Sequence, residues 1–115
     1  MQDVLTQLNR VRGVGGSLLL SADGLPMSSA LRTGTDENLL AASLAEAISS
    51  STRMCQHLTL GAPSAFTATC AQGTVLLLGA GPAYVAILVD PTANLALLQI
   101  EAKSIIERIA QRIAL

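Results

Sequence analysis

The chain has 115 residues, of which half are apolar, 13% are charged and only 2% are aromatic, and its seven basic and eight acidic residues nearly balance. This length is typical of one domain, so we expect a single domain over residues 1–115 with an aliphatic core. Balanced charge and so few aromatic side chains disfavour nucleic-acid binding.

The run of residues 74–89 is nearly all apolar, which raises the question of membrane insertion. A Gly-Ala-Gly-Pro sequence at 79–82 interrupts the run and no basic residue flanks it, so two buried strands fit better than a spanning helix. The N-terminal residues lack the basic segment and apolar run of a signal peptide. We therefore expect a cytoplasmic protein that does not insert into membranes.

The first third of the chain predicts a helix and a hairpin. Apolar residues at positions 4, 5, 8 and 11 indicate an amphipathic helix over residues 2–12. A strand over 17–21, a tight turn at Asp23-Gly24 and a returning strand over 25–31 follow. Pro26 near the start of the returning strand favours an edge position, because proline cannot donate to the ladder.

The stretch 36–58 predicts one long helix, with Asp36 or Thr35 as its N-cap. Successive residues of an α-helix are rotated by about 100° around its axis. The residues of this stretch therefore fall on three sides: a sheet-facing side, a ridge of small side chains and a polar shoulder. The sheet-facing side comprises Leu40, Leu44, Ala47, Ile48, Ser51, Cys55 and Leu58, the ridge Ala42, Ala45, Ser49 and Thr52, and the shoulder Glu46, Arg53 and His57.

The remaining residues predict three strands and a final helix. Residues 64–71 alternate like a half-buried strand, and 75–78 and 84–89 are continuous apolar strands buried on both faces. Asp90-Pro91-Thr92 predicts the start of the last helix. We therefore predict an α+β (α/β) three-layer sandwich. A five-stranded, mainly antiparallel sheet carries the long helix on one face and the two terminal helices on the other.

Few residues are candidates for chemistry. His57 is the single histidine, and no carboxylate lies one turn from it, so a surface or interface role is favoured over a catalytic or metal-binding one. Cys55 fits a small core residue, whereas Cys70 either does the same or approaches its own copy across a dimer seam. The spacing of the two cysteines suits neither a metal nor a redox motif. We expect no catalytic residue, no metal and no cofactor.

Two surfaces are more informative. The ridge of small side chains allows a second helix to approach closely. The strand 64–71 contains no Lys, Glu or Arg, so an exposed edge there would invite aggregation unless it is paired. Pairing with its own copy about a two-fold axis would give a homodimer. The predicted dimer interface comprises Ala45, Ser49, Thr52, Phe66, Thr67, Ala68, Thr69 and Cys70.

The segment Gly13-Val-Gly-Gly-Ser-Leu-Leu-Leu-Ser-Ala-Asp-Gly-Leu-Pro-Met27 resembles the opening hairpin of the roadblock / dynein light chain family. The segment Asn94-Leu-Ala-Leu-Leu-Gln-Ile-Glu-Ala-Lys103 resembles the start of that family's last helix, and the order of elements agrees. The resemblance implies a fold of roadblock/profilin-like type and a homodimer with one continuous sheet. Among bacterial MglB-like members it also implies partnership with a Ras-like small GTPase. The face that it assigns to the partner would include Ala42, Ala45, Glu46, Ser49, Arg53 and His57.

Three hypotheses follow for function. The first is a non-enzymatic, homodimeric regulator or scaffold that binds a Ras-like small GTPase and could stimulate GTP hydrolysis. The second is a dimeric scaffold for another signalling or motor-like assembly. The third is a small enzyme or ligand-binding protein that uses Cys55 or His57, which requires a polar pocket that the sequence does little to line.

Overall fold

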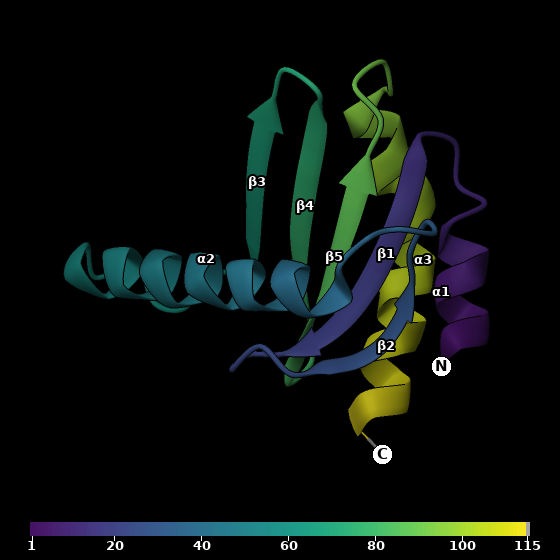
Figure 1. Cartoon of the computed structure of the whole chain (residues 1–115). Helices are drawn as coiled ribbons and strands as arrows, with labels where there is room; N and C mark the ends of the chain where they lie inside the picture. The colour runs from purple at the N-terminus through teal and green to yellow at the C-terminus, as the bar shows by residue number, and fades with distance from the viewer. Residues whose placement is uncertain (115) are drawn as a thin grey trace.

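The computed structural model describes residues 1–114, whose strands form one antiparallel sheet between two layers of helices (Figure 1). The elements are α1 (Gln2–Leu8), β1 (Val14–Ser21), β2 (Pro26–Ala30), α2 (Glu37–His57), β3 (Ala65–Cys70), β4 (Gly73–Ala80), β5 (Ala83–Val89) and α3 (Leu95–Ala114). The strand order β2-β1-β5-β4-β3 makes β2 and β3 the edges, as predicted for both.

Each face of the sheet has its own apolar core. One core joins α1 and α3 to the sheet through residues such as Leu5, Leu98 and Ile87. The other joins α2 to the opposite face through Leu44 and Ile48. The predicted three-layer arrangement is therefore confirmed, and the central strands are apolar without alternation because both of their faces are covered.

The long helix α2 begins where the sequence predicted, because Asp36 Oδ1 accepts a hydrogen bond of 3.0 Å from the Leu39 N–H. Ser51 is the last buried residue of the helix, although six helical residues follow it. Those six residues extend about 9 Å, roughly two strand spacings. Figure 1 shows the C-terminal part of α2 projecting past β3, the edge strand. We call residues 52–60 the projecting end.

Two predicted helix boundaries were wrong, and β1 begins at Val14, three residues before its predicted start at residue 17. The first helix ends at Leu8 and not at residue 12. After the C-cap Asn9 the backbone bonds shorten to three-residue turns, from Arg10 N–H to the Gln7 carbonyl and from Val11 N–H to the Leu8 carbonyl, and the Asn9 side chain bonds the Ala30 carbonyl at 2.8 Å. The last helix begins at Leu95 instead of at Asp90, since the Asn94 side chain accepts from the N–H of Leu97. Asp90 instead forms an ion pair of 3.3 Å with Arg32.

Polar contacts tie the two terminal helices together. Arg112 Nη1 lies 3.4 Å from the Asp3 carboxylate, and Arg108 donates to Gln7 Oε1 at 2.6 Å. A hydrogen bond from the N-terminal ammonium, together with the charges of that ammonium and of Arg112, lowers the pKa of the Asp3 carboxyl. These contacts hold α1 on the same layer as α3.

Candidate partner-binding surfaces

One side of α2 packs on the chain's own β1–β2 hairpin. A Cβ added at Gly24, in the hairpin turn, would lie 2.5 Å from the Cβ of Ala45, so the two backbones approach closely there. Ala41 is buried beside this contact. We call the side that carries Ala41 and Ala45 the hairpin side. The close packing of α2 on the hairpin of the same chain therefore explains why residue 45 has a small side chain, without a contact to a second chain.

The outer face of α2 carries Glu46, Arg53 and His57, all of them exposed. The Arg53 guanidinium donates to Ser49 Oγ at 3.0 Å and to Ser50 Oγ at 3.5 Å. No carboxylate within residues 1–114 lies within ion-pair distance of it. Hydroxyls leave the charge of an arginine uncompensated, so Arg53 presents a positioned positive charge to solvent.

The third side of α2, which we call the open side, carries Ala47, Ser50 and Met54. Met54 is nine residues from Ala45 and therefore about half a turn around the helix from it. Figure 1 shows the β1–β2 turn on one side of α2 and the β3–β4 turn on the other. The open side therefore faces the part of the sheet that α2 leaves uncovered.

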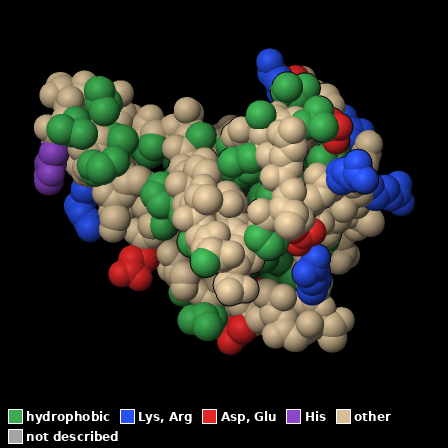
Figure 2. Space-filling model, turned by 90° about the horizontal axis from the view of Figure 1, so that it is seen from above, with side chains coloured by type: hydrophobic (Ala, Val, Ile, Leu, Met, Phe, Trp, Pro, Cys, Tyr) green, Lys and Arg blue, Asp and Glu red, His purple; other side chains and the backbone are tan. Residues whose placement is uncertain are grey.

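The projecting end is apolar and largely uncovered. Met54 is 55% exposed, Leu58 59% and Leu60 70%. Figure 2 shows hydrophobic side chains gathered at this end of the molecule, beside a hollow that separates the end from the remaining mass. Three large apolar side chains this exposed at one helix end are unusual for a monomer and indicate a contact surface.

The edge strand β3 has one free row of backbone groups. Cys70 pairs with Gly73 across a two-residue turn, and Gly79 N–H donates to the Ser64 carbonyl at 2.9 Å. Because hydrogen bonding alternates along an antiparallel pair, Ser64, Phe66, Ala68 and Cys70 bond to β4. The backbone groups of Ala65, Thr67 and Thr69 then point away from the sheet.

The uncovered part of the sheet lies on the same face as α2. Phe66 packs under the helix in the core of this face, while Ala68, on the same strand face, is only half-buried. A hollow of about 450 Å³ covers this area, with Cys70, Val75 and Leu88 among its lining residues. An apolar sheet face without a helix above it is a second uncovered surface next to the projecting end.

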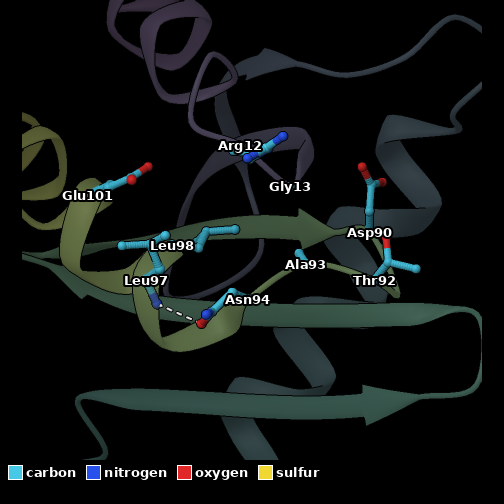
Figure 3. Close-up of a pocket in the computed structure, with 9 residues that line it drawn as sticks. All are labelled: Arg12, Gly13, Asp90, Thr92, Ala93, Asn94, Leu97, Leu98 and Glu101. Carbon is cyan, nitrogen blue, oxygen red and sulfur yellow. Dashed lines mark hydrogen bonds between the residues drawn. The ribbon is translucent and has the colours of Figure 1, made fainter.

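A second hollow, of about 580 Å³, lies on the other layer beside the start of α3 (Figure 3). Arg12 and Glu101 stand at its rim, and both are exposed. The Asn94 side chain is engaged by the Leu97 N–H at 3.1 Å, as Figure 3 shows. Asn94 is used to cap the helix and Arg12 and Glu101 are exposed at the rim, so this hollow has no buried polar side chain to fix a ligand.

Other classes of site find no support in residues 1–114. No three of their His, Cys, Asp and Glu side chains are grouped so that they could bind a metal ion. None of the helices in this range is both long and apolar enough to cross a membrane. The exposed His57 and the half-buried Cys55 lie in none of the hollows described above.

The sequence placed most of the candidate residues together but missed the projecting end. Ala42, Glu46, Ser49, Arg53 and His57 are all exposed on α2. Leu58 was expected in the core, whereas it is exposed. Helix length was the available signal: 21 residues span about 32 Å, more than the roughly 24 Å width of five strands.

Comparison with known proteins identifies relatives over most of the chain. The sequence model of the Roadblock/LC7 domain matches residues 1–89. An uncharacterized protein of Methanocaldococcus jannaschii, MJ0714, is 30% identical over 92% of this chain and 90% of its own length.

Solved structures share the fold along the whole chain. The Roadblock/LC7 domain from Streptomyces avermitilis has a TM-score of 0.89 at 19% identity and covers 100% of this chain and 98% of its own. MglB of Myxococcus xanthus has a TM-score of 0.91 at 15% identity, covering 98% and 94%. At these identities the likeness is one of fold.

Proposed function

This chain belongs to the Roadblock/LC7 domain family, and from that membership we propose that it is a cytoplasmic, homodimeric regulator or scaffold that binds a Ras-like small GTPase. The sequence resemblance to bacterial MglB-like members supports the choice of a GTPase. The outer face of α2, with its positioned Arg53, is the observation that carries the proposal. The proposal includes stimulation of GTP hydrolysis in the same complex.

The first contact of the proposed dimer joins two copies of β3. Ala65, Thr67 and Thr69 have free backbone groups, so an antiparallel pair engages all of them only when Thr67 faces the partner's Thr67. Each facing pair of this type exchanges two hydrogen bonds, which gives about six in total. Other registers leave one of these residues unpaired. The two-fold axis then passes between the two Thr67 residues, along the normal to the sheet.

The second contact covers the apolar surfaces. Rotation about this axis brings the projecting end of each copy above the uncovered part of the other copy's sheet. Met54 and Leu58 would then meet Ala68 and Val75 of the other copy. Removing a large apolar side chain from water stabilises a contact by about 1.5–3 kcal/mol when burial is complete. The open sides of the two α2 helices lie against each other in this arrangement.

The outer face remains free in such a dimer. Because both α2 helices lie on the same side of the joined sheet, two copies of Glu46, Arg53 and His57 form one exposed surface. A GTPase with an acidic patch is the complementary partner for Arg53. Ala45 lies on the hairpin side, so we assign the partner to the outer face and the dimer contact to the open side.

The binding test uses a Ras-like GTPase from the same genome, loaded with GDP or with a non-hydrolysable GTP analogue. We expect the wild-type chain to bind one nucleotide state more tightly, and Arg53→Glu to weaken that binding at least tenfold. Isothermal titration calorimetry measures both affinities. Arg10→Glu is the matched control, because Arg10 is an exposed arginine on the other layer.

Equal loss of affinity in the two variants would indicate non-specific charge attraction and would contradict the assigned surface. A stable dimer that binds the GTPase in neither nucleotide state would instead favour a scaffold for another assembly.

A further inference from the structure

One row of apolar side chains on the α2 face of the sheet has no helix of residues 1–114 above it. The register joins Ala68 to Val75, Val75 to Leu88 and Leu88 to Gly16, so the row crosses four strands from the edge β3 to β1. Ala68, Val75 and Leu88 are only half-buried, although Leu88 belongs to β5, the central strand. We call this row the open row. A half-buried leucine at the centre of a sheet indicates that a cover is missing.

The neighbouring row shows what such a cover looks like. Phe66, Leu77, Ala86 and Leu18 face one another in the same register, and all four belong to the apolar core beneath α2. The two rows are two residues apart along the strands, about 7 Å, which is close to the 8–10 Å between packed helices. One more helix segment beside α2 would therefore cover the open row.

We propose that the projecting end of a second copy is this cover, and that its Leu60 is seated on Leu88 in the hollow of about 450 Å³. Each hollow is then completed by a residue of the other chain. This inference rests on the homodimer of the proposed function and names the side-chain contact that anchors it.

The strand register of the proposed dimer places the second copy's helix over the open row. With Thr67 facing its own copy, Phe66 of one chain faces Ala68 of the other. The helix α2 lies above Phe66, so its continuation past the edge strand lies above the other copy's Ala68, where the open row begins. Figure 1 shows α2 running across the strands and not along them. The continuation therefore follows the row toward Val75 and Leu88.

The reach of the projecting end matches the length of this row. Ser51 lies beside Phe66 of β3, and a helix crosses one strand spacing of about 4.8 Å in roughly three residues. Residue 54 therefore lies above the other copy's β3, residues 57–58 lie above its β4, and residue 60 lies near its β5. Packed layers stand about 10 Å apart, a distance that side chains from both layers fill. Leu60 and Leu88 are thus within reach of each other.

Leu60 is exposed but held in place. Its side chain is 70% exposed, while its N–H donates to the Cys55 carbonyl at 2.9 Å. Leu58, two residues earlier, is seven residues after the buried Ser51 and so shares the sheet-facing side of α2. A large apolar side chain that is fixed in water at the sheet-facing end of a helix indicates a contact with another molecule.

The strand contact alone is too small for a stable dimer. The strand β3 has six residues, and its backbone hydrogen bonds cover little apolar surface, whereas stable interfaces bury about 1,200–2,000 Å² in total. The exposed side chains of Met54, Leu58 and Leu60 and the open row are the apolar surfaces next to this edge. Their contact supplies the area that the strand pair lacks, so a second copy is the occupant that fits.

The experiment uses the full chain with its cysteines reduced. Isotope-labelled and unlabelled chains are refolded together, so that about half of the dimers contain one chain of each kind by random pairing. Isotope-filtered NOE spectroscopy then detects contacts between the two chains alone. We expect inter-chain signals between the methyl groups of Leu60 and Leu88 in a species of twice 11.8 kDa.

A pair of variants measures what the contact contributes. Leu60→Asp should weaken the dimer at least tenfold in a sedimentation dilution series, because the carboxylate would have to be desolvated in the hollow. Leu25→Asp is the matched control and should leave the affinity unchanged. Leu25 is 64% exposed and lies in the β1–β2 turn, far from β3.

Three results would overturn the inference. A dimer without inter-chain signals between Leu60 and Leu88, or one that Leu60→Asp does not weaken, removes the Leu60 contact and leaves the proposed function standing. Equal weakening by Leu60→Asp and Leu25→Asp means a general effect of added charge. A wild-type chain that sediments as a monomer at micromolar concentration removes both the inference and the proposed dimer.

Discussion

Asn9 connects three elements through one side chain. Its Nδ2 donates to the Ala30 carbonyl at 2.8 Å, and its Oδ1 accepts from the Ser17 hydroxyl at 2.7 Å. Ser17 is fully buried at 0% exposure. This residue therefore both ends α1 and fixes it against β1 and β2.

We expect Asn9→Ala to destabilise the fold by about 1–3 kcal/mol, because the Ala30 carbonyl loses the Asn9 donor and the buried Ser17 hydroxyl keeps only its longer bond of 3.4 Å to the Leu5 carbonyl. Urea unfolding measures the loss as a lower midpoint with an unchanged slope. Gln2→Ala is the control, because the Gln2 side chain donates to the Ser29 carbonyl in an exposed position. Similar losses in the two variants would argue against the buried network.

Thr59 holds a conformation that favours glycine. Its φ is +59°, and it stands at the position after the C-cap of α2. The Leu60 N–H bonds the Cys55 carbonyl at 2.9 Å and the Thr59 N–H bonds the Gln56 carbonyl at 3.1 Å, which is the Schellman pattern. A β-branched side chain at this φ is strained.

Thr59→Gly should therefore stabilise the chain by about 1 kcal/mol, since glycine adopts this φ without a steric penalty. Thermal unfolding should show a higher Tm for glycine and a smaller gain for Thr59→Ala, which keeps a Cβ. A glycine variant that melts below the wild type would contradict the strain.

At the scale of the elements, the proposed dimer fixes the register between the two copies of β3, in which Thr67 faces its own copy. We expect Thr67→Cys, in a chain whose own cysteines are replaced by serine, to cross-link to its copy under oxidation. The facing Cα atoms would be about 5.5 Å apart, within disulfide reach. A non-reducing gel detects the bond.

Thr69→Cys in the same background is the matched control. The two copies of residue 69 would be about 13 Å apart along the strands, so no bond should form. Cross-linking at residue 69 but not at 67 would show a different register.

The projecting end gives a second element-scale prediction. Met54→Asp should weaken the dimer at least tenfold, because a carboxylate would have to be desolvated in an apolar contact. Ile100→Asp makes the same change at a position that is 72% exposed on α3 and should leave the dimer intact. Sedimentation over a dilution series compares the two, and equal weakening would contradict the role of the open side.

The sequence predicted the elements whose signals are local. Asp36 as a cap and the aliphatic period of α2 gave its bounds to within one residue, and Pro26 marked the edge strand β2. The first helix was made too long because Val11 continues its apolar pattern, although Asn9 has already left the helix. Asp90-Pro91 looks like a helix start, but Asn94 supplies the cap.

The candidate site was harder to predict because its orientation depends on distant contacts. The side of α2 that packs on the hairpin is decided by the approach of Gly24 to Ala45, and no pattern within residues 36–58 contains this contact. The ridge of small residues was therefore interpreted as a helix–helix surface, whereas part of it packs on the chain's own hairpin. The exposed polar residues Glu46, Arg53 and His57 could be assigned to one side of α2 from the helical period alone, so the sequence predicted that they lie together.

At the scale of the whole molecule, the low charge of the chain has a physical use in the proposed dimer. Only 13% of the residues are charged. The surfaces that meet in the proposed dimer are β3, which carries no charged residue, the side of the projecting end with Met54 and Leu58, and the uncovered part of the sheet. These surfaces are joined along one edge, so a single two-fold contact removes all of them from water. The charges that α2 does carry lie on the outer face, away from that contact.

Sedimentation velocity of the reduced chain, alone and with a GTP-analogue-loaded Ras-like GTPase, tests the central claim most directly. The account predicts a species of twice 11.8 kDa at micromolar concentration, and a heavier species that contains two chains when the GTPase is added. It also predicts that Arg53→Glu keeps the first species and loses the second. A species of 11.8 kDa that does not change on adding the GTPase would contradict the account.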